Sequence, residues 1–219
     1  MRTRVKICCI SSQAEASLAI AHGADALGLV GRMPSGPGVI GDEQIAAIAM
    51  AIPPPIASFL LTSEQSAAEI IAHGRRALTN TIQIVDELKE GDYREIRRML
   101  PHLRLVQVIH MTGEDAIEQA LAVQNEVDAL LLDSGNPKAA VKTLGGTGKT
   151  HNWAISRELV SRVKIPVFLA GGLHPGNVQE AIRTVLPFGV DICSGVRTNG
   201  HLDPMKLVSF MEAVQSCST

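Results

Sequence analysis

The chain is poor in aromatic residues, which make up 3% of its 219 positions and include one tryptophan and one tyrosine. Proteins that hold single-stranded nucleic acid stack its bases on aromatic rings, so this scarcity argues against such a surface. The charge balance agrees, because 20 Lys and Arg against 22 Asp and Glu give a net charge of −2 and no basic run. We therefore expect no nucleic-acid partner and no anionic membrane surface as a partner.

Long apolar segments are also missing from the chain. Proline, glycine or a charged residue interrupts each hydrophobic run before it reaches the roughly 20 residues that a transmembrane helix needs. The first residues, Met1-Arg-Thr-Arg-Val-Lys-Ile, pass directly into a strand-like run without the apolar core and small-residue cleavage site of a signal peptide. These features predict a cytoplasmic protein.

Cysteine is scarce too, with four residues at positions 8, 9, 193 and 217. In a reducing compartment we expect all four to be free thiols. The seven histidines show neither the two-histidine helical spacing nor the CxxC partner of a zinc site, so we expect no bound metal.

Short apolar runs alternate with longer stretches of helical spacing along the whole chain, which indicates βαβ units and a parallel sheet. Candidate strands cover residues 4–9, 24–30, 56–61, 81–85, 103–109, 129–133, 166–170 and 190–193. Candidate helices cover residues 12–22, 42–51, 64–74, 92–100, 114–124, 154–163, 175–185 and 204–215. Eight strands with eight helices predict an α/β protein with a single (β/α)8 TIM barrel domain over residues 1–219.

An open, doubly wound sheet shares this alternation and is the alternative architecture. Such a sheet carries its phosphate motif after the first strand, where this chain reads Cys8-Cys9-Ile10-Ser11-Ser12. The glycine-rich segments instead come late, after the sixth, seventh and eighth candidate strands. A TIM barrel places its phosphate site in that part of the chain.

Three late segments, at residues 144–148, 170–173 and 193–196, each combine glycines with the end of a candidate strand. One such segment alone would only end a strand or cap a helix. Three that converge on one barrel face can present backbone N–H groups to a phosphate without help from Lys or Arg. We predict a phosphate site built from Gly146, Thr147, Gly148, Gly171, Gly172, Ser194 and Gly195.

Two ionisable side chains occupy other strand ends. If Val5, Ile7 and Cys9 pack outward against helices, strand alternation points Lys6 and Cys8 into the barrel. The same count turns Asp133 inward at the end of Leu130-Leu-Leu-Asp133. Inward residues at the carboxyl ends of barrel strands are candidates for catalysis.

The segment Lys6-Ile-Cys-Cys-Ile10 resembles the KICGI opening of the phosphoribosylanthranilate isomerases, which are TIM-barrel enzymes of tryptophan biosynthesis. The likeness continues in order to the end of the chain. It includes Gly23-Ala-Asp-Ala-Leu-Gly28, Leu131-Leu-Asp-Ser134, Gly145-Gly-Thr-Gly-Lys-Thr150, Trp153, Leu169-Ala-Gly-Gly-Leu173, Asn177-Val178, Gly189-Val-Asp191 and Ser194-Gly-Val196.

This resemblance implies an Amadori rearrangement of N-(5-phosphoribosyl)anthranilate, in which an aldose amine becomes a ketose amine. It implies Asp133 as the general acid at the ring oxygen and Cys8 as the base that removes the C2 proton. It also implies a phosphorylated sugar as substrate, no metal or organic cofactor, and a monomer or homodimer. A base must be a thiolate, and we expect the nearby cation of Lys6 to lower the pKa of Cys8.

The chain departs from the family pattern on the aglycone side. Its Ser35-Gly36-Pro37 has Pro37 where the family carries the arginine that holds the anthranilate carboxylate, and Arg32 is the candidate replacement. The family's Gln-Leu-His-Gly reads Gln83-Ile-Val-Asp86. Further possible substrate contacts are Lys6, Gln83 and Asp191. Two alternatives stay open, a sugar-phosphate isomerase with another aglycone and a noncatalytic phosphate-binding barrel.

Overall fold

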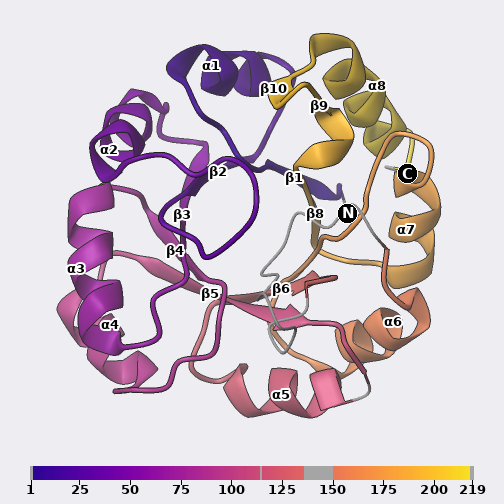
Figure 1. The fold of residues 1–219 in the computed structure, drawn as a ribbon. Helices are drawn as coiled ribbons and strands as arrows, with labels where there is room; N and C mark the ends of the chain where they lie inside the picture. Colours follow the sequence, from indigo (N-terminus) through magenta and orange to yellow (C-terminus); the bar gives the residue numbers. More distant parts are fainter. Residues whose placement is uncertain (1, 114, 136–149, 218–219) are drawn as a thin grey trace.

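The structure is a computed structural model that describes residues 2–113, 115–135 and 150–217, and it forms a closed parallel barrel surrounded by helices (Figure 1). The barrel strands are β1 (Arg4–Ile7), β2 (Ala26–Val30), β3 (Ala57–Thr62), β4 (Thr81–Ile84), β5 (Arg104–His110), β6 (Ala129–Asp133), β7 (Val167–Leu169) and β8 (Gly189–Ile192). The helices are α1 (Gln13–Ala21), α2 (Asp42–Ala51), α3 (Ala67–Ala77), α4 (Tyr93–Met99), α5 (Asp115–Val123), α6 (Trp153–Arg162), α7 (Val178–Val185) and α8 (Pro204–Gln215).

Closure of the barrel depends on the pairing of the first strand with the last. Strand β1 pairs in parallel with β2 on one side and with β8 on the other, in a register that runs from Arg4↔Gly189 to Ile7↔Ile192. An open sheet would leave β1 and β8 without this contact. The TIM barrel prediction is therefore confirmed, and the doubly wound alternative is wrong.

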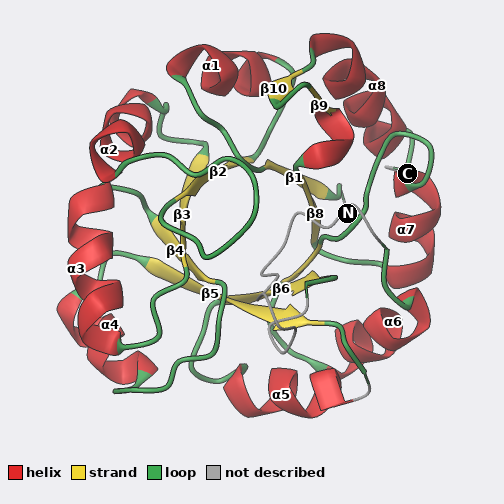
Figure 2. Cartoon of the chain, in the orientation of Figure 1, coloured by secondary structure: helices red, strands yellow, loops and turns green. Residues whose placement is uncertain are grey.

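Strand alternation divides the apolar side chains into two clusters. Val5 and Ile7 belong to the large cluster between the strands and the surrounding helices. Cys8 and Leu131 belong to a smaller cluster inside the barrel. Figure 2 shows the corresponding arrangement, with an inner ring of strands and an outer ring of helices. Side chains that reach the end of the inner cluster are thus placed at the barrel mouth.

Helix α3 begins three residues later than the sequence predicts. The expected start at residue 64 is wrong because the side chain of Ser66 accepts a hydrogen bond from the backbone N–H of Glu69, which makes Ser66 the N-cap. The Ser66 hydroxyl also donates to the Glu69 carboxylate, at 2.8 Å. These two contacts stabilise the first turn and fix its start.

Three short elements lie between β8 and α8 that the sequence pattern does not predict. They are the 3₁₀ helix η1 (Ser194–Val196) and the two-stranded hairpin of β9 (Arg197–Thr198) and β10 (His201–Leu202). Asp203 then caps α8, accepting from the N–H groups of Met205 and Lys206. Among the described residues, no helix has the length and apolar character needed to cross a bilayer.

The hairpin brings Arg197 against Glu15 of α1, in an ion pair that is nearly buried. Arg197 Nη1 lies 2.9 Å from Glu15 Oε1, and the two side chains are 7% and 11% exposed. Although burial alone would raise it, the pKa of Glu15 is lowered to about 2 by hydrogen bonds from Arg197 and from the backbone N–H groups of Leu202 and Ser11. The pair fastens the segment after β8 to the segment after β1.

We expect Glu15→Gln to lower the free energy of unfolding at pH 7 by about 3 kcal/mol, because it leaves the Arg197 charge buried without its partner. The folded-state pKa lies below the unfolded value of about 4.3, so the ion pair's contribution is present above pH 4.3 and is lost as the pH falls toward 2. Urea unfolding from neutral to acid pH should show the two proteins converging.

The matched control is Glu158→Gln, which removes an exposed pair with Arg162 within α6. An exposed pair of this kind contributes about 0.5 kcal/mol or less. A loss at Glu15 no larger than the loss at Glu158 would contradict the structural role of the Arg197 pair.

Candidate active site

A cavity opens at the carboxyl ends of the strands, with a volume of about 770 Å³ including the space open to solvent. Its lining residues come from β1, β2, β3, β4, β5, β6, β7 and β8 or from the loops after them. They are Cys8, Cys9, Val30, Met33, Ser35, Gly36, Pro37, Leu61, Gln83, Val85, Val108, Leu131, Asp133, Ala170, Gly171, Gly172, Leu173, Asp191, Ile192, Cys193 and Ser194. This is the face on which TIM barrels carry their active sites.

Cys8 lies directly after β1 and is 5% exposed. Its backbone N–H donates to the carbonyl of Ile192, at 2.8 Å. Its sulfur lies over Gly28 of β2, where an added Cβ would stand only 2.8 Å from Cys8 Sγ and 3.1 Å from Lys6 Nζ. The missing side chain of Gly28 therefore makes room for both the thiol and the ammonium group.

Lys6 and Asp191 form an ion pair inside the barrel, with Nζ and Oδ1 2.9 Å apart. The side chain of Lys6 is fully buried, and its ammonium group also lies 5.3 Å from the centre of the Phe59 ring. Burial favours the neutral amine, but Asp191 and Cys8 outweigh it and raise the pKa of Lys6. Lys6 thus holds a positive charge beside the thiol.

The thiol of Cys8 responds mainly to its burial, which raises its pKa to about 11. The cation of Lys6 acts in the opposite direction, as the sequence suggests, while the anion of Asp191 adds to the rise. The expected effect of Lys6 on the thiol pKa is therefore confirmed in direction, but burial outweighs it and the net pKa is raised. Desolvation of a thiolate in a closed barrel exceeds the attraction of a cation that is already paired.

Asp133 ends β6 on the same cavity and is 7% exposed. Burial raises the pKa of its carboxyl to about 6, although the N–H of Ser134 donates to Oδ1 at 2.8 Å and acts in the opposite direction. The negative charge of Asp191 contributes to the rise. The cavity thus contains a carboxyl that is half protonated near pH 6 and a thiol of raised pKa.

Two of the three glycine segments meet at the rim of this cavity. Gly171 and Gly172 have φ angles of 85° and 61°, a left-handed conformation that favours glycine. Gly195 packs so closely on the loop after β7 that an added Cβ would stand 2.1 Å from the carbonyl oxygen of Leu173. Ser194 lines the cavity beside them. The third segment, with Gly146, Thr147 and Gly148, lies outside the described residues.

The two candidates for the aglycone side are separated by the fold. Gln83 of β4 lines the cavity and is 3% exposed, and its Oε1 has no hydrogen-bond partner among the described residues. Arg32 has an exposed side chain and is not one of the lining residues. Its carbonyl accepts a hydrogen bond from Ser63 Oγ, at 2.9 Å. The structure therefore brings Gln83 to the cavity and leaves Arg32 outside it.

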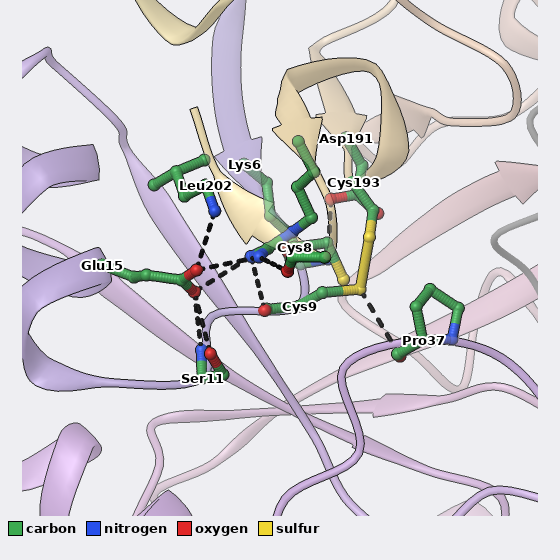
Figure 3. The surroundings of a disulfide bond; sticks show 11 residues. Lys6, Cys8, Cys9, Ser11, Glu15, Pro37, Asp191, Cys193 and Leu202 are labelled. Atoms are coloured by element: carbon green, nitrogen blue, oxygen red, sulfur yellow. Dashed lines mark hydrogen bonds and ion pairs between the residues drawn. A yellow bond between two sulfur atoms is a disulfide. The ribbon is translucent and has the colours of Figure 1, made fainter. Parts of the chain in front are cut away.

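Strand alternation predicts that Cys9 points outward, and the structure shows that it does not. Strand β1 ends at Ile7, and Cys9 adopts a φ of 63°, which turns its side chain to the cavity. There it forms a disulfide with Cys193, across a Cα–Cα distance of 5.9 Å (Figure 3). The expectation of four free thiols is wrong for this pair, because barrel closure brings together residues that are 184 positions apart. Cys8 and Cys217 are free.

Arg197 is a residue near the site that sequence reasoning missed. Its Nη2 donates to the carbonyls of Cys9 and Cys8, at 2.5 and 3.3 Å, while the same guanidinium holds Glu15. It lies three residues after Ser194 in sequence, but no motif marks it as a contact of the first strand.

The described residues contain no group of three or more His, Cys, Asp or Glu side chains that could hold a metal ion.

Comparison with known proteins gives a consistent result. The family model described as N-(5'phosphoribosyl)anthranilate (PRA) isomerase matches residues 5–213. An N-(5'-phosphoribosyl)anthranilate isomerase of Methanocella arvoryzae is 34% identical over 214 residues, which cover 97% of this chain and 98% of the relative.

Solved structures of proteins with the same name share the fold. The phosphoribosyl anthranilate isomerase of Thermotoga maritima is 27% identical, with a TM-score of 0.80 over 98% of this chain and 99% of that one. A second isomerase structure, in complex with reduced 1-(o-carboxyphenylamino)-1-deoxyribulose 5-phosphate, is 24% identical. Its TM-score is 0.77 over 98% of this chain and 99% of that one.

The contact between Gly28 and Cys8 can be tested by adding one methyl group. We expect Gly28→Ala to lower the free energy of unfolding by about 1–3 kcal/mol, the range for overpacking a core, because the new carbon meets the thiol and the ammonium group together. Gly41→Ala is the matched control, since an added Cβ there meets nothing within 4 Å. Equal denaturant midpoints for the two variants would contradict the close contact.

Proposed function

This chain belongs to the N-(5′-phosphoribosyl)anthranilate isomerase family, and we propose that Cys8 and Asp133 are its general base and general acid. The reaction converts N-(5′-phosphoribosyl)anthranilate to 1-(2-carboxyphenylamino)-1-deoxyribulose 5-phosphate. The observation that carries the proposal is that a buried thiol and a buried carboxyl of raised pKa line one cavity, next to the loops of Gly171 and Ser194. Acid and base are then placed on the same anchored substrate.

In the proposed reaction Asp133 donates one proton to the substrate and Cys8 removes one from it. The carboxyl of Asp133 donates its proton to the ring oxygen while the C1–O bond breaks and the nitrogen lone pair forms an iminium. The thiolate of Cys8 removes the C2 proton, and the electrons of that C–H bond neutralise the iminium to give an enolamine. Return of a proton to C1 and loss of the proton on the C2 hydroxyl give the ketose amine. Up to the enolamine each group changes protonation once, which is the role of a general acid and base. Before the next turnover Cys8 releases its proton to solvent and Asp133 takes one up, which returns the enzyme to its starting state.

The raised pKa of Asp133 suits a group that must donate a proton. A carboxyl with an ordinary pKa near 4 would be ionised at neutral pH, whereas burial raises the pKa of Asp133 to about 6. Cys8 is the more difficult partner, because its thiol must lose a proton in an apolar site. Lys6 is the cation that stabilises the thiolate when it forms, since its charge lowers the pKa of Cys8.

The substrate phosphate is assigned to the glycine loops at the rim, at Gly171, Gly172, Ser194 and Gly195, together with residues 146–148. Turns rich in glycine present N–H groups to a dianion without a side-chain cation. Gln83 and Asp191 are assigned to the sugar and the amine, because both line the cavity and Gln83 Oε1, without a hydrogen-bond partner among the described residues, can accept from an N–H or O–H group. We propose that the protein acts on this small phosphorylated sugar in the cytoplasm, as a single-domain monomer or a homodimer.

The proposal is tested by the turnover of N-(5′-phosphoribosyl)anthranilate by the purified protein. We expect Cys8→Ser and Asp133→Asn each to lower kcat by at least about 100-fold, the usual scale for losing a general acid or base, with little loss of stability. Cys217→Ser is the matched control for thiol chemistry, because Cys217 lies at the end of α8 and is free. Activity retained in Cys8→Ser would remove the proposed base.

The pH profile of kcat/KM tests the protonation states. The active form needs the Cys8 thiolate and the Asp133 acid, and with pKa values of about 11 and about 6 its population rises with pH up to about 6. It then stays level, because each gain of thiolate is matched by a loss of protonated Asp133, and it falls only near pH 11. A thiolate formed at low pH would instead make activity fall above pH 6, which would contradict the raised thiol pKa.

A further inference from the structure

The disulfide joins the two strand ends that carry the proposed chemistry. Cys9 directly follows Cys8, the proposed base. Cys193 directly precedes Ser194 and Gly195, which we call the phosphate loop, so the bond connects the proposed base to this loop. Both of its residues line the cavity. Figure 3 shows the bond crossing from the end of β1 to the end of β8, with Cys9 Sγ 3.7 Å from the carbonyl oxygen of Pro37.

The barrel seam is held by other contacts besides this bond. Strands β1 and β8 share a register of four residue pairs, and the N–H of Cys8 extends the ladder to Ile192. The guanidinium of Arg197 ties the carbonyls of Cys8 and Cys9 to the segment after β8. Opening the disulfide is therefore a local change at the cavity rim and leaves the seam closed.

The two sides of the bond differ in their freedom to move. Cys9 is 5% exposed and packs so tightly on Gly38 that an added Cβ there would stand 2.5 Å from Cys9 Cβ. Its carbonyl is held by Arg197. Cys193 is half-buried and is followed by exposed Ser194. Because two thiols need more room than two bonded sulfurs, the Cys193 side is the one that shifts when the bond opens.

We propose that Cys9 and Cys193 form a reversible thiol–disulfide site, whose bridged form fixes the phosphate loop at Ser194 and whose open form releases it. The inference rests on the proposed function for the role of Ser194, whereas the redox chemistry of the pair stands independently of it. The co-reactant is a dithiol, either a small molecule or a protein with paired cysteines. The bridged form prevails under oxidising conditions and the open form in the presence of excess dithiol.

The exchange proceeds by two thiolate attacks. A thiolate of the reductant attacks Sγ of Cys193, the less buried of the two residues, so that a mixed disulfide forms and the Cys9 thiolate leaves and takes up a proton. The second thiol of the reductant then attacks the reductant's first sulfur, which is bonded to Cys193 in the mixed disulfide. The Cys193 thiolate is released and takes up a proton. The protein gains two electrons and two protons, and the reductant becomes a disulfide.

The first test identifies the bridge by its chemistry. Protein purified without reductant is denatured, alkylated and digested, and mass spectrometry should show Cys8 and Cys217 alkylated and a peptide pair joined through Cys9 and Cys193. Pretreatment with dithiothreitol should make all four cysteines available, and oxidised glutathione should restore the bridge. Four alkylated cysteines in the untreated protein, with no bridge formed by oxidised glutathione, would overturn the proposal whatever the enzyme's activity.

The second test follows the phosphate loop. We expect dithiothreitol to weaken the binding of inorganic phosphate and to raise KM by roughly threefold to tenfold while kcat changes less, because the segment at Ser194 is freed whereas the backbone at Cys8 and Cys9 stays held by Arg197. Cys9→Ser and Cys193→Ser should have the weaker phosphate affinity without reductant and should not respond to it. Cys217→Ser should respond as the natural chain does.

The outcomes separate this inference from the proposed function. Phosphate binding measured by calorimetry does not require turnover, so a redox effect on phosphate in a protein that does not isomerise the substrate would refute the function and support the site. A bridge that opens and closes with no change in phosphate affinity or KM would overturn the proposed role of the bond.

Discussion

The ion pair between Lys6 and Asp191 is the constraint on which the rest of the site depends. A fully buried ammonium group is tolerated only with a close partner, and this partner comes from β8, the strand that closes the barrel on β1. The pair therefore links barrel closure to the position of a charge. Because that charge lies beside Gly28 and beneath Cys8, the same contact sets the electrostatic environment of the proposed base.

The pair has opposing effects on the pKa values of the proposed acid and base. Asp191 is an anion near both groups and raises the pKa of each, while Lys6 lowers each, so within the barrel the pair largely offsets itself. Burial is then the dominant cause for both groups and favours their neutral forms. A free enzyme with a neutral thiol and a carboxyl poised near pH 6 follows from this balance.

The eight strands and eight helices were predictable because each repeats a local pattern, and strand alternation correctly turned Lys6, Cys8 and Asp133 inward. The same alternation failed at Cys9, where the chain leaves β1 in a left-handed conformation that apolar spacing does not encode. The disulfide and the ion pair between Arg197 and Glu15 were not predictable for a related reason. Both join segments more than 180 positions apart, and their contact exists only once the register between β1 and β8 is fixed.

The aglycone side of the cavity shows how the loss of one cation changes recognition. Its described lining has Val30, Met33 and Pro37 on one side and no Arg or Lys side chain, since Arg32 is exposed outside it. A carboxylate that enters an apolar site without a charged partner carries a desolvation cost, so it is better placed where solvent still reaches it. We propose that Gln83 takes part instead, because its buried Oε1, which has no hydrogen-bond partner among the described residues, can accept a hydrogen bond from the amine of the substrate. On this proposal, recognition in this chain shifts from the carboxylate toward the N–H group that every N-linked aglycone of this reaction must carry.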